Sequence, residues 1–115
     1  MNVLKYFVPV LVIVLFLTKE SSAQKVFACQ YKSEADVKVF VAQYKSEADL
    51  VVYKCSYKSD VSGNNGFWFF TEYKSDADKK IFFTQYKSEA DVVIFFTPYK
   101  SEAAWENNSK KQFFY

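Results

Sequence analysis

The sequence predicts a small, mostly β domain built from six strand-turn repeats of about thirteen residues. Two further observations support this fold class: apolar residues recur at two consecutive positions of every copy, and aromatic residues make up 21% of the chain. The copies are YKSEAD at Tyr31 and Tyr44, YKSD at Tyr57, YKSDAD at Tyr73, YKSEAD at Tyr86 and YKSEA at Tyr99. Because one unit is used over and over, its physics dictates most of the architecture.

A strand is predicted in each copy just before its tyrosine. The position four residues before the tyrosine holds Phe27, Phe40, Tyr53, Phe69, Phe82 and Phe95, and the position before that holds Val26, Val39, Val52, Trp68, Ile81 and Ile94. β-Branched and aromatic residues favour strands. Adjacent residues of a strand point to opposite faces, so two consecutive apolar columns predict strands that are covered on both faces.

A tight turn is predicted after each tyrosine, because the phrase Lys-Ser-Glu-Ala-Asp places a serine three residues before an acid. This is the spacing of a capping box, in which the serine oxygen and the carboxylate accept hydrogen bonds from backbone N–H groups. The predicted capping residues are Ser33 and Asp36, Ser46 and Asp49, Ser75 and Asp78, and Ser88 and Asp91.

The third copy is longer than the others, because Val61–Gly66 stretches its spacing from thirteen to sixteen residues. The chain's only two glycines, Gly63 and Gly66, lie here, and we expect them to adopt positive φ in a longer loop. Predicted structural anchors are the six repeat tyrosines at the strand ends and two tryptophans, namely Tyr31, Tyr44, Tyr57, Tyr73, Tyr86, Tyr99, Trp68 and Trp105.

Residues 1–23 have the layout of a secretory signal peptide. Lys5 precedes an apolar run, and Ser21–Ala23 supplies small residues before a cut, which would leave a repeat domain of residues 24–115. The run is too short to favour a membrane span. We therefore expect an exported protein, periplasmic or secreted, with a formal charge of +1 once Lys5, Lys19 and Glu20 are removed from a chain of charge +2.

The two cysteines suggest one disulfide, Cys29 to Cys55, because export leads to oxidising compartments. Both precede a repeat tyrosine by two residues, in the first and third copies. Alternate strands of a plain meander lie about 9 to 10 Å apart, too far for a disulfide. A bridge would therefore make alternate copies neighbours in an interleaved winding. The alternative for Cys29 is a lipid anchor.

The chain resembles a small family of bacterial proteins known for the septoil knot, a seven-crossing torus knot. The resemblance is carried by the YKSEAD-type phrase with strand cores such as Asp36–Phe40 and Asp78–Phe82, by Gly66–Phe70, and by the tail Ala103–Asn107 followed by Ser109–Lys111 and Phe113–Tyr115. It implies a compact β-rich domain whose chain winds around itself into a deep knot. It brings no activity, ligand or catalytic residue. Without it, a β-solenoid or a closed β-meander would be the alternatives.

Several functional classes are disfavoured by composition. The chain has no His, the commonest general base and metal ligand near neutral pH, and two glycines cannot form a phosphate-binding loop. Repeated acidic turns raise calcium as a candidate, but they lack the glycines and close Asp spacing of calcium loops. The near-neutral charge and lack of Arg argue against nucleic acid. We expect no catalytic, cofactor-binding or metal site.

The remaining hypotheses are non-enzymatic. The first is an exported structural module of unknown molecular role, selected for resistance to unfolding, and we expect it to be a monomer. The second is a binding module for a cell-surface polymer or protein partner, and the tyrosine column would suit a carbohydrate platform. The third is a secreted subunit that assembles through the edges of its repeated strands.

Overall fold

The computed structural model describes residues 24–61 and 63–115, so the predicted signal peptide lies outside the described residues. Each copy forms a short strand followed by a single 3-10 turn, as the repeat predicts. The strands are β1 (Lys25–Ala28), β2 (Val37–Val41), β3 (Leu50–Lys54), β4 (Phe67–Phe70), β5 (Lys79–Phe83), β6 (Val92–Thr97) and β7 (Ala104–Trp105). The turns are η1 (Lys32–Glu34), η2 (Lys45–Glu47), η3 (Lys58–Asp60), η4 (Lys74–Asp76), η5 (Lys87–Glu89) and η6 (Lys100–Glu102), and the described chain ends with the longer η7 (Asn108–Phe114).

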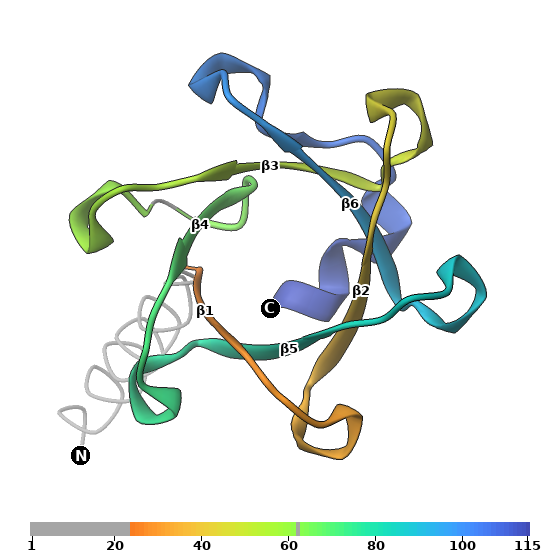
Figure 1. Ribbon diagram of the computed structural model, residues 1–115. Helices are drawn as coiled ribbons and strands as arrows, with labels where there is room; N and C mark the ends of the chain where they lie inside the picture. The colour runs from red at the N-terminus through yellow and green to blue at the C-terminus, as the bar shows by residue number, and fades with distance from the viewer. Residues whose placement is uncertain (1–23, 62) are drawn as a thin grey trace, which may run out of the picture.

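The first six strands close into a parallel barrel in the order β4, β1, β5, β2, β6, β3, with β3 returning to β4. Figure 1 shows this ring of crossing strands, with the six turns projecting outward as separate lobes. The seventh strand, β7, adds antiparallel to the start of β3. The mostly β fold of repeated strand-turn units is confirmed.

In five of the six barrel ladders, the neighbouring strands come from copies three or four apart in the chain. The prediction that alternate copies are neighbours was wrong, because β1 pairs with β4 and β5 and not with β3. Among the described strands of the barrel, consecutive copies pair only where β3 meets β4, so the strand order excludes the meander and solenoid alternatives. The chain is interleaved, as predicted, but most neighbouring strands come from copies three or four apart instead of two apart.

In every barrel ladder, equivalent repeat positions of the two paired strands are shifted by two residues, always in the same direction around the barrel. Val26 of β1 lies opposite Lys79 of β5, and Ile81 of β5 then lies opposite Val37 of β2. An even offset keeps inward-facing positions inward, because side chains alternate with a period of two. Strand stagger and strand tilt are linked in a closed barrel. The repeated offset therefore tilts all six strands in the same sense.

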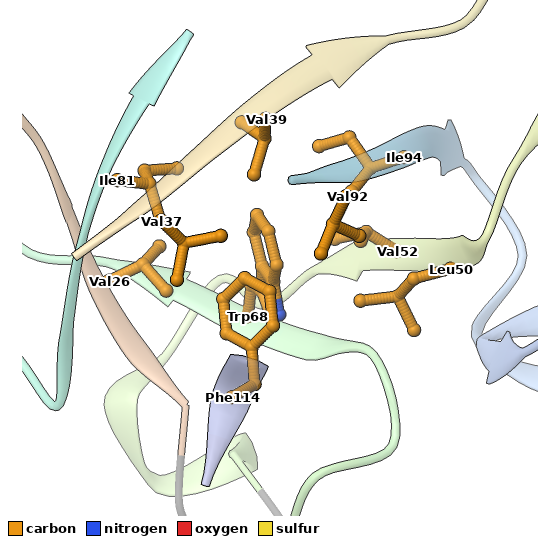
Figure 2. Close-up of a cluster of buried hydrophobic side chains, with 10 residues drawn as sticks. All are labelled: Val26, Val37, Val39, Leu50, Val52, Trp68, Ile81, Val92, Ile94 and Phe114. Carbon is orange, nitrogen blue, oxygen red and sulfur yellow. The ribbon is translucent and has the colours of Figure 1, made fainter. Parts of the chain in front are cut away.

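The barrel interior is filled by side chains from all six strands. One from each strand is fully buried: Val26, Val39, Val52, Trp68, Ile81 and Ile94. Val37, Leu50 and Val92, which lie two residues earlier in β2, β3 and β6, belong to the same buried cluster. Figure 2 shows Trp68 among the surrounding aliphatic side chains. Because Trp68 is far larger than the other five, it fills the middle of the barrel, and burial of such side chains is the main source of stability. The column predicted to be buried is the barrel core.

The outward column is only half-buried, so the prediction that both strand faces are covered was too strong. Phe27, Phe40 and Phe82 of this column are each of intermediate exposure. The turns project outward from the ring (Figure 1) and do not form a second layer over the strands. The outer face is therefore partly open to solvent.

The C-terminal η7 packs against one region of the barrel core. Phe114 is 1% exposed, and its ring centroid lies 5.1 Å from that of Trp68 and 6.1 Å from that of Trp105. The Gln24 side chain donates to the Phe114 carbonyl at 3.0 Å. Trp105 Nε1 donates to the backbone oxygen of Asn64, so the long third-copy loop is tied to the tail. Trp68 is thus a core anchor and Trp105 a closing anchor, as predicted.

Candidate functional site

The predicted capping aspartates bind a neighbouring strand instead of their own turn. Asp36 Oδ2 accepts from the backbone N–H of Lys80 at 3.0 Å, while the N–H of Asp36 donates to the Lys80 carbonyl at 2.7 Å. The same paired bonds join Asp49 to Val93, Asp78 to Lys25, and Asp91 to Lys38. We call these four pairs the aspartate clasps. They reinforce the four consecutive ladders from β1 through β5, β2 and β6 to β3.

The predicted capping serines do not cap. The residue at the N-cap of η1, η2, η4 and η5 is the repeat tyrosine, without a side-chain capping bond, while Ser33, Ser46, Ser75 and Ser88 lie inside the turns and are exposed. Three-residue 3-10 turns are too short for the capping-box geometry, which needs the N–H groups of a longer helix. The capping-box prediction was therefore wrong for the serines.

A threonine two residues before the tyrosine organises the turn in the last three copies. In the sixth copy, Thr97 Oγ1 accepts from the N–H of Tyr99 at 3.1 Å and donates to Glu102 Oε1 at 2.6 Å. The same contacts join Thr71 to Tyr73 and Asp76, and Thr84 to Tyr86 and Glu89. The sequence reasoning missed this network, although Thr recurs at the same position of three copies.

The corresponding position in the first three copies holds Cys29, Ala42 and Cys55, all buried. The two cysteines are free thiols, so the predicted disulfide is absent from the structure. Their equivalent spacing comes from the repeat, in which each occupies the small buried site that threonine fills elsewhere. Burial is the main cause that raises the pKa of both thiols above the usual value of 9.0.

We expect the two buried thiols to react slowly in the folded protein. A thiol reagent added without reductant should modify neither Cys29 nor Cys55 quickly in buffer, and both in denaturant. The raised pKa values also favour the protonated thiol in the folded state, so this contribution to stability is present below pH 9 and is lost as the pH rises through the raised values. Finding no reactive thiol in denaturant would show that a disulfide forms after all.

Substitutions two residues before the repeat tyrosine should show how much the threonine hydroxyl contributes to the free energy of unfolding. Thr97→Val is expected to lower the free energy of unfolding by about 1 to 2 kcal/mol, because the N–H of Tyr99 loses its acceptor and Glu102 its donor. Cys55→Thr, the matched change in the opposite direction, places a hydroxyl near Asp60 and should be neutral or stabilise by up to about 1 kcal/mol. Urea unfolding of both variants tests this, and a destabilised Cys55→Thr would contradict the equivalence.

Ion pairs link four of the six pairs of neighbouring turns around the barrel. Lys58 of η3 contacts Asp76 of η4 at 2.8 Å, and Lys32 of η1 contacts Glu89 of η5 at 3.4 Å. Further pairs join Lys74 to Glu34 and Lys45 to Glu102. The hydrogen bond from Lys58 is the largest cause that lowers the pKa of Asp76. Exposed pairs of this kind stabilise little, but they fix where the charged groups lie.

The six repeat tyrosines are exposed, with fractions from 59% for Tyr31 to 70% for Tyr57. Their backbone carbonyls open the 3-10 turns, as when Tyr31 O accepts from the N–H of Glu34 at 3.1 Å. The anchoring that the structure shows is therefore through the backbone, while the rings of Tyr31, Tyr44, Tyr57, Tyr73, Tyr86 and Tyr99 face solvent.

Two equivalent clefts lie beside these tyrosines in the fourth and fifth copies. Their volumes are about 220 Å³ and about 280 Å³. Each is lined by two consecutive phenylalanines, the organising threonine, the exposed tyrosine, the turn acid and a lysine from the neighbouring turn. The fourth-copy cleft is lined by Phe69, Phe70, Thr71, Glu72, Tyr73, Asp76 and Lys58. The fifth-copy cleft contains Phe82, Phe83, Thr84, Tyr86, Glu89 and Lys32.

The strand ends nearest these clefts carry an aromatic cluster. Phe70 lies 6.3 Å from Phe83 and 6.2 Å from Phe96, measured between ring centroids. Lys54, which interrupts this apolar column in the sequence, places its ammonium 4.5 Å from the centre of the Phe96 ring and 5.6 Å from that of Phe70. The lysine is therefore accommodated by cation–π contact.

Two absences among the described residues bear on the site. In residues 24–61 and 63–115, no three or more His, Cys, Asp or Glu side chains gather in a group that would hold a metal ion. Within the same ranges, no helix has the length and apolar character needed to cross a membrane. The arrangement that remains is a ring of aromatic and paired charged side chains around the barrel.

The protein is a small β domain of the repeat-built class, because its closed barrel consists of interleaved parallel strands that repeated turns connect. Residues 23–106 match the model of a family described as the 7(1) septoil knot domain. The chain belongs to this family, and the resemblance seen in the sequence is confirmed. No curated protein and no solved structure matches the chain.

Proposed function

We propose that the chain is an exported, non-enzymatic structural module whose role depends on resistance to unfolding and proteolysis. The observation that carries this proposal is the pairing of strands from copies three or four apart in five of the six barrel ladders. The residue pair Lys25 and Phe69 illustrates the sequence separation that these five ladders bridge. In a chain threaded as a seven-crossing knot, strands cannot separate one after another from an end without unthreading the others.

The chemistry of the described residues supports a non-enzymatic role. The sequence has no His, and the turn acids are engaged in ion pairs and hydrogen bonds that repeat from copy to copy. An enzyme site is normally unique and contains groups with strongly shifted pKa values poised for proton transfer. The repeated acids therefore serve to hold turns together.

Export with cleavage before Gln24 is part of the proposal. The family match begins at residue 23, so the matched domain needs little of the predicted leader. Lipidation at Cys29 would require a cut that removes β1, which pairs with both β4 and β5. Closure of the six strands also leaves only short edges for assembly, which favours a monomer over a self-assembling subunit.

Folding kinetics test the structural role. Because five of the six barrel ladders join copies three or four apart, refolding from urea should be slower than milliseconds, and the native state should unfold with a half-life of days. Stopped-flow and manual-mixing circular dichroism on residues 24–115 would measure both rates. Millisecond refolding together with unfolding in seconds would contradict the proposed role.

A second candidate function is a binding module. It is favoured by the six exposed tyrosines and by the two clefts beside Tyr73 and Tyr86. A module that acted only through its stability would not need large aromatic side chains in solvent at equivalent positions. Exposed aromatic groups that combine an apolar ring with a polar tip are enriched where proteins bind partners.

A further inference from the structure

The surroundings of the last three tyrosines, two of which lie beside a cleft, differ from those of the first three. Only the fourth, fifth and sixth copies contain the segment Phe-Phe-Thr-x-Tyr, at Phe69–Tyr73, Phe82–Tyr86 and Phe95–Tyr99. In the first three copies the second phenylalanine and the threonine are replaced by Ala28 with Cys29, Val41 with Ala42, and Lys54 with Cys55. The six exposed tyrosines therefore fall into two sets of three.

The sixth copy has the same polar arrangement as the two copies with clefts. Glu102 accepts from Thr97 at 2.6 Å and pairs with Lys45 of η2 at 3.7 Å, just as Glu89 accepts from Thr84 and pairs with Lys32 of η1. The three arrangements lie between η3 and η4, between η1 and η5, and between η2 and η6. Since the strands run β4, β1, β5, β2, β6, β3 around the ring, they occupy every second gap between turns.

The polar groups of each cleft are held in place before any ligand arrives. In the fifth-copy cleft, Glu89 is oriented by the Thr84 hydroxyl at 3.3 Å and by Lys32 at 3.4 Å. Its side chain is still 44% exposed, and that of Lys32 is 54% exposed. One carboxylate and one ammonium thus lie side by side with spare hydrogen-bonding capacity, and their formal charges cancel. Charge-assisted hydrogen bonds from such groups are the stronger kind.

The shape and charge of the clefts define the ligand class. Volumes of about 220 Å³ and about 280 Å³ fall below the roughly 300 to 1,000 Å³ of pockets that enclose whole drug-sized ligands. Each cleft therefore suits one ring of a longer molecule. The paired charges of the fifth-copy cleft favour a neutral ligand rich in hydroxyl groups, and in the fourth-copy cleft Lys25 contacts Asp76 in addition to Lys58 and so offsets the further carboxylate of Glu72. The exposed Tyr86 ring offers an apolar face for the C–H surface of a sugar.

We propose that the two clefts and the equivalent surface beside Tyr99 are three subsites for a neutral polysaccharide, and that each holds one sugar ring. The sugar stacks on the tyrosine, and its hydroxyl groups bond to the turn acid and to the lysine of the neighbouring turn. Each subsite binds weakly by itself, and a polymer that reaches more than one subsite gains affinity from the raised effective concentration. This inference rests on the second candidate function, that of a binding module, and does not depend on the structural role.

Affinity electrophoresis of residues 24–115 tests the proposal. The gels contain a neutral β-glucan, a xylan or a galactomannan, with hyaluronan as an acidic comparison, and insoluble chitin and peptidoglycan are tested by co-sedimentation. At least one neutral polysaccharide is expected to retain the protein. The triple variant Tyr73→Ala, Tyr86→Ala and Tyr99→Ala should weaken that retention at least about tenfold, because stacking is lost at all three subsites.

The first three tyrosines supply the matched control. The variant Tyr31→Ala, Tyr44→Ala and Tyr57→Ala removes equally exposed rings that line neither cleft, and its retention should stay within about twofold. Circular dichroism melts check that both variants are folded. Equal losses in the two variants, retention by hyaluronan alone, or no retention by any of the polysaccharides would overturn the proposal.

These binding experiments also distinguish failure of the saccharide subsites from failure of the binding-module function on which they rest. Lack of polysaccharide binding, combined with capture of one stoichiometric protein partner that the tyrosine variants lose, would overturn the saccharide subsites and leave the binding-module function standing. Lack of both would remove the two together. Neither outcome would bear on the folding rates that test the structural module.

Discussion

Trp68→Ala is expected to lower the free energy of unfolding by about 3 to 5 kcal/mol, the range for removal of a large aromatic side chain from a packed core. Trp68 is fully buried and packs against Phe114 and Phe70, with ring centroids 5.1 Å and 6.1 Å away. Since domains of this size are stabilised by only about 5 to 15 kcal/mol, much of the total would be lost. Equilibrium urea unfolding followed by circular dichroism measures the change.

Trp68→Phe is the matched control for this prediction. It keeps an aromatic ring beside Phe114 and removes the indole N–H, which has no hydrogen-bond partner among the described residues. The expected loss is about 1 to 2 kcal/mol, because a smaller volume is vacated and a buried donor is deleted. A cost for Trp68→Ala no larger than that for Trp68→Phe would show that the barrel interior is not packed around this side chain.

Gly66→Ala is expected to lower the free energy of unfolding by about 3 kcal/mol or more. Gly66 has a φ of +92°, which side chains rarely adopt, and an added Cβ would lie 2.4 Å from the backbone oxygen of Val51. The carbonyl of Gly66 also accepts from the N–H of Tyr53 at 2.8 Å, where β3 meets β4. A shift of this segment would therefore disturb the ladder that closes the barrel.

Gly63→Ala provides the comparison for Gly66→Ala. Gly63 also has positive φ, +59°, but the nearest atom to an added Cβ is a side-chain atom of Asn65 at 3.5 Å. Only the backbone cost of about 1 to 2 kcal/mol is expected there. Thermal and urea unfolding of the two variants should separate them clearly, and equal stabilities would mean that the close approach to Val51 does not constrain the fold.

The strands and the inward column could be predicted from the sequence because their signal is local. The residues Val26, Val39 and Ile81 are apolar and β-branched at a fixed distance from each tyrosine, and all three are fully buried. The positive φ of Gly63 and Gly66 was also predictable, since glycine is the residue that adopts it without strain. These features depend on neighbours in the chain.

The order of the strands could not be read from the sequence, because near-identical copies offer each other near-identical edges. The cysteines misled the prediction, since Cys29 and Cys55 repeat in register only because they share a small buried position with Thr71 and its equivalents. The partners of the aspartates were hidden for the same reason. Asp36 meets Lys80 only because the ladders are offset by two residues, which the local spacing does not reveal.

The clefts could be predicted only in part from the sequence. The tyrosine column was predicted as a possible platform for carbohydrate, but the threonine that orients the turn acid was missed. Its signal was present, because Thr71, Thr84 and Thr97 recur two residues before a tyrosine. The contribution of Lys32 to the cleft of Tyr86 depends on which turns are neighbours, and this follows only from the strand order.

The neighbour relations of the strands are the central claim, and nuclear Overhauser spectroscopy on isotope-labelled residues 24–115 tests them most directly. Backbone contacts are expected between Lys38 and Phe82 and between Phe40 and Val93, which lie opposite one another in the β2–β5 and β2–β6 ladders. Contacts that instead join β2 to β1 or to β3 as ladder neighbours would contradict the interleaved barrel.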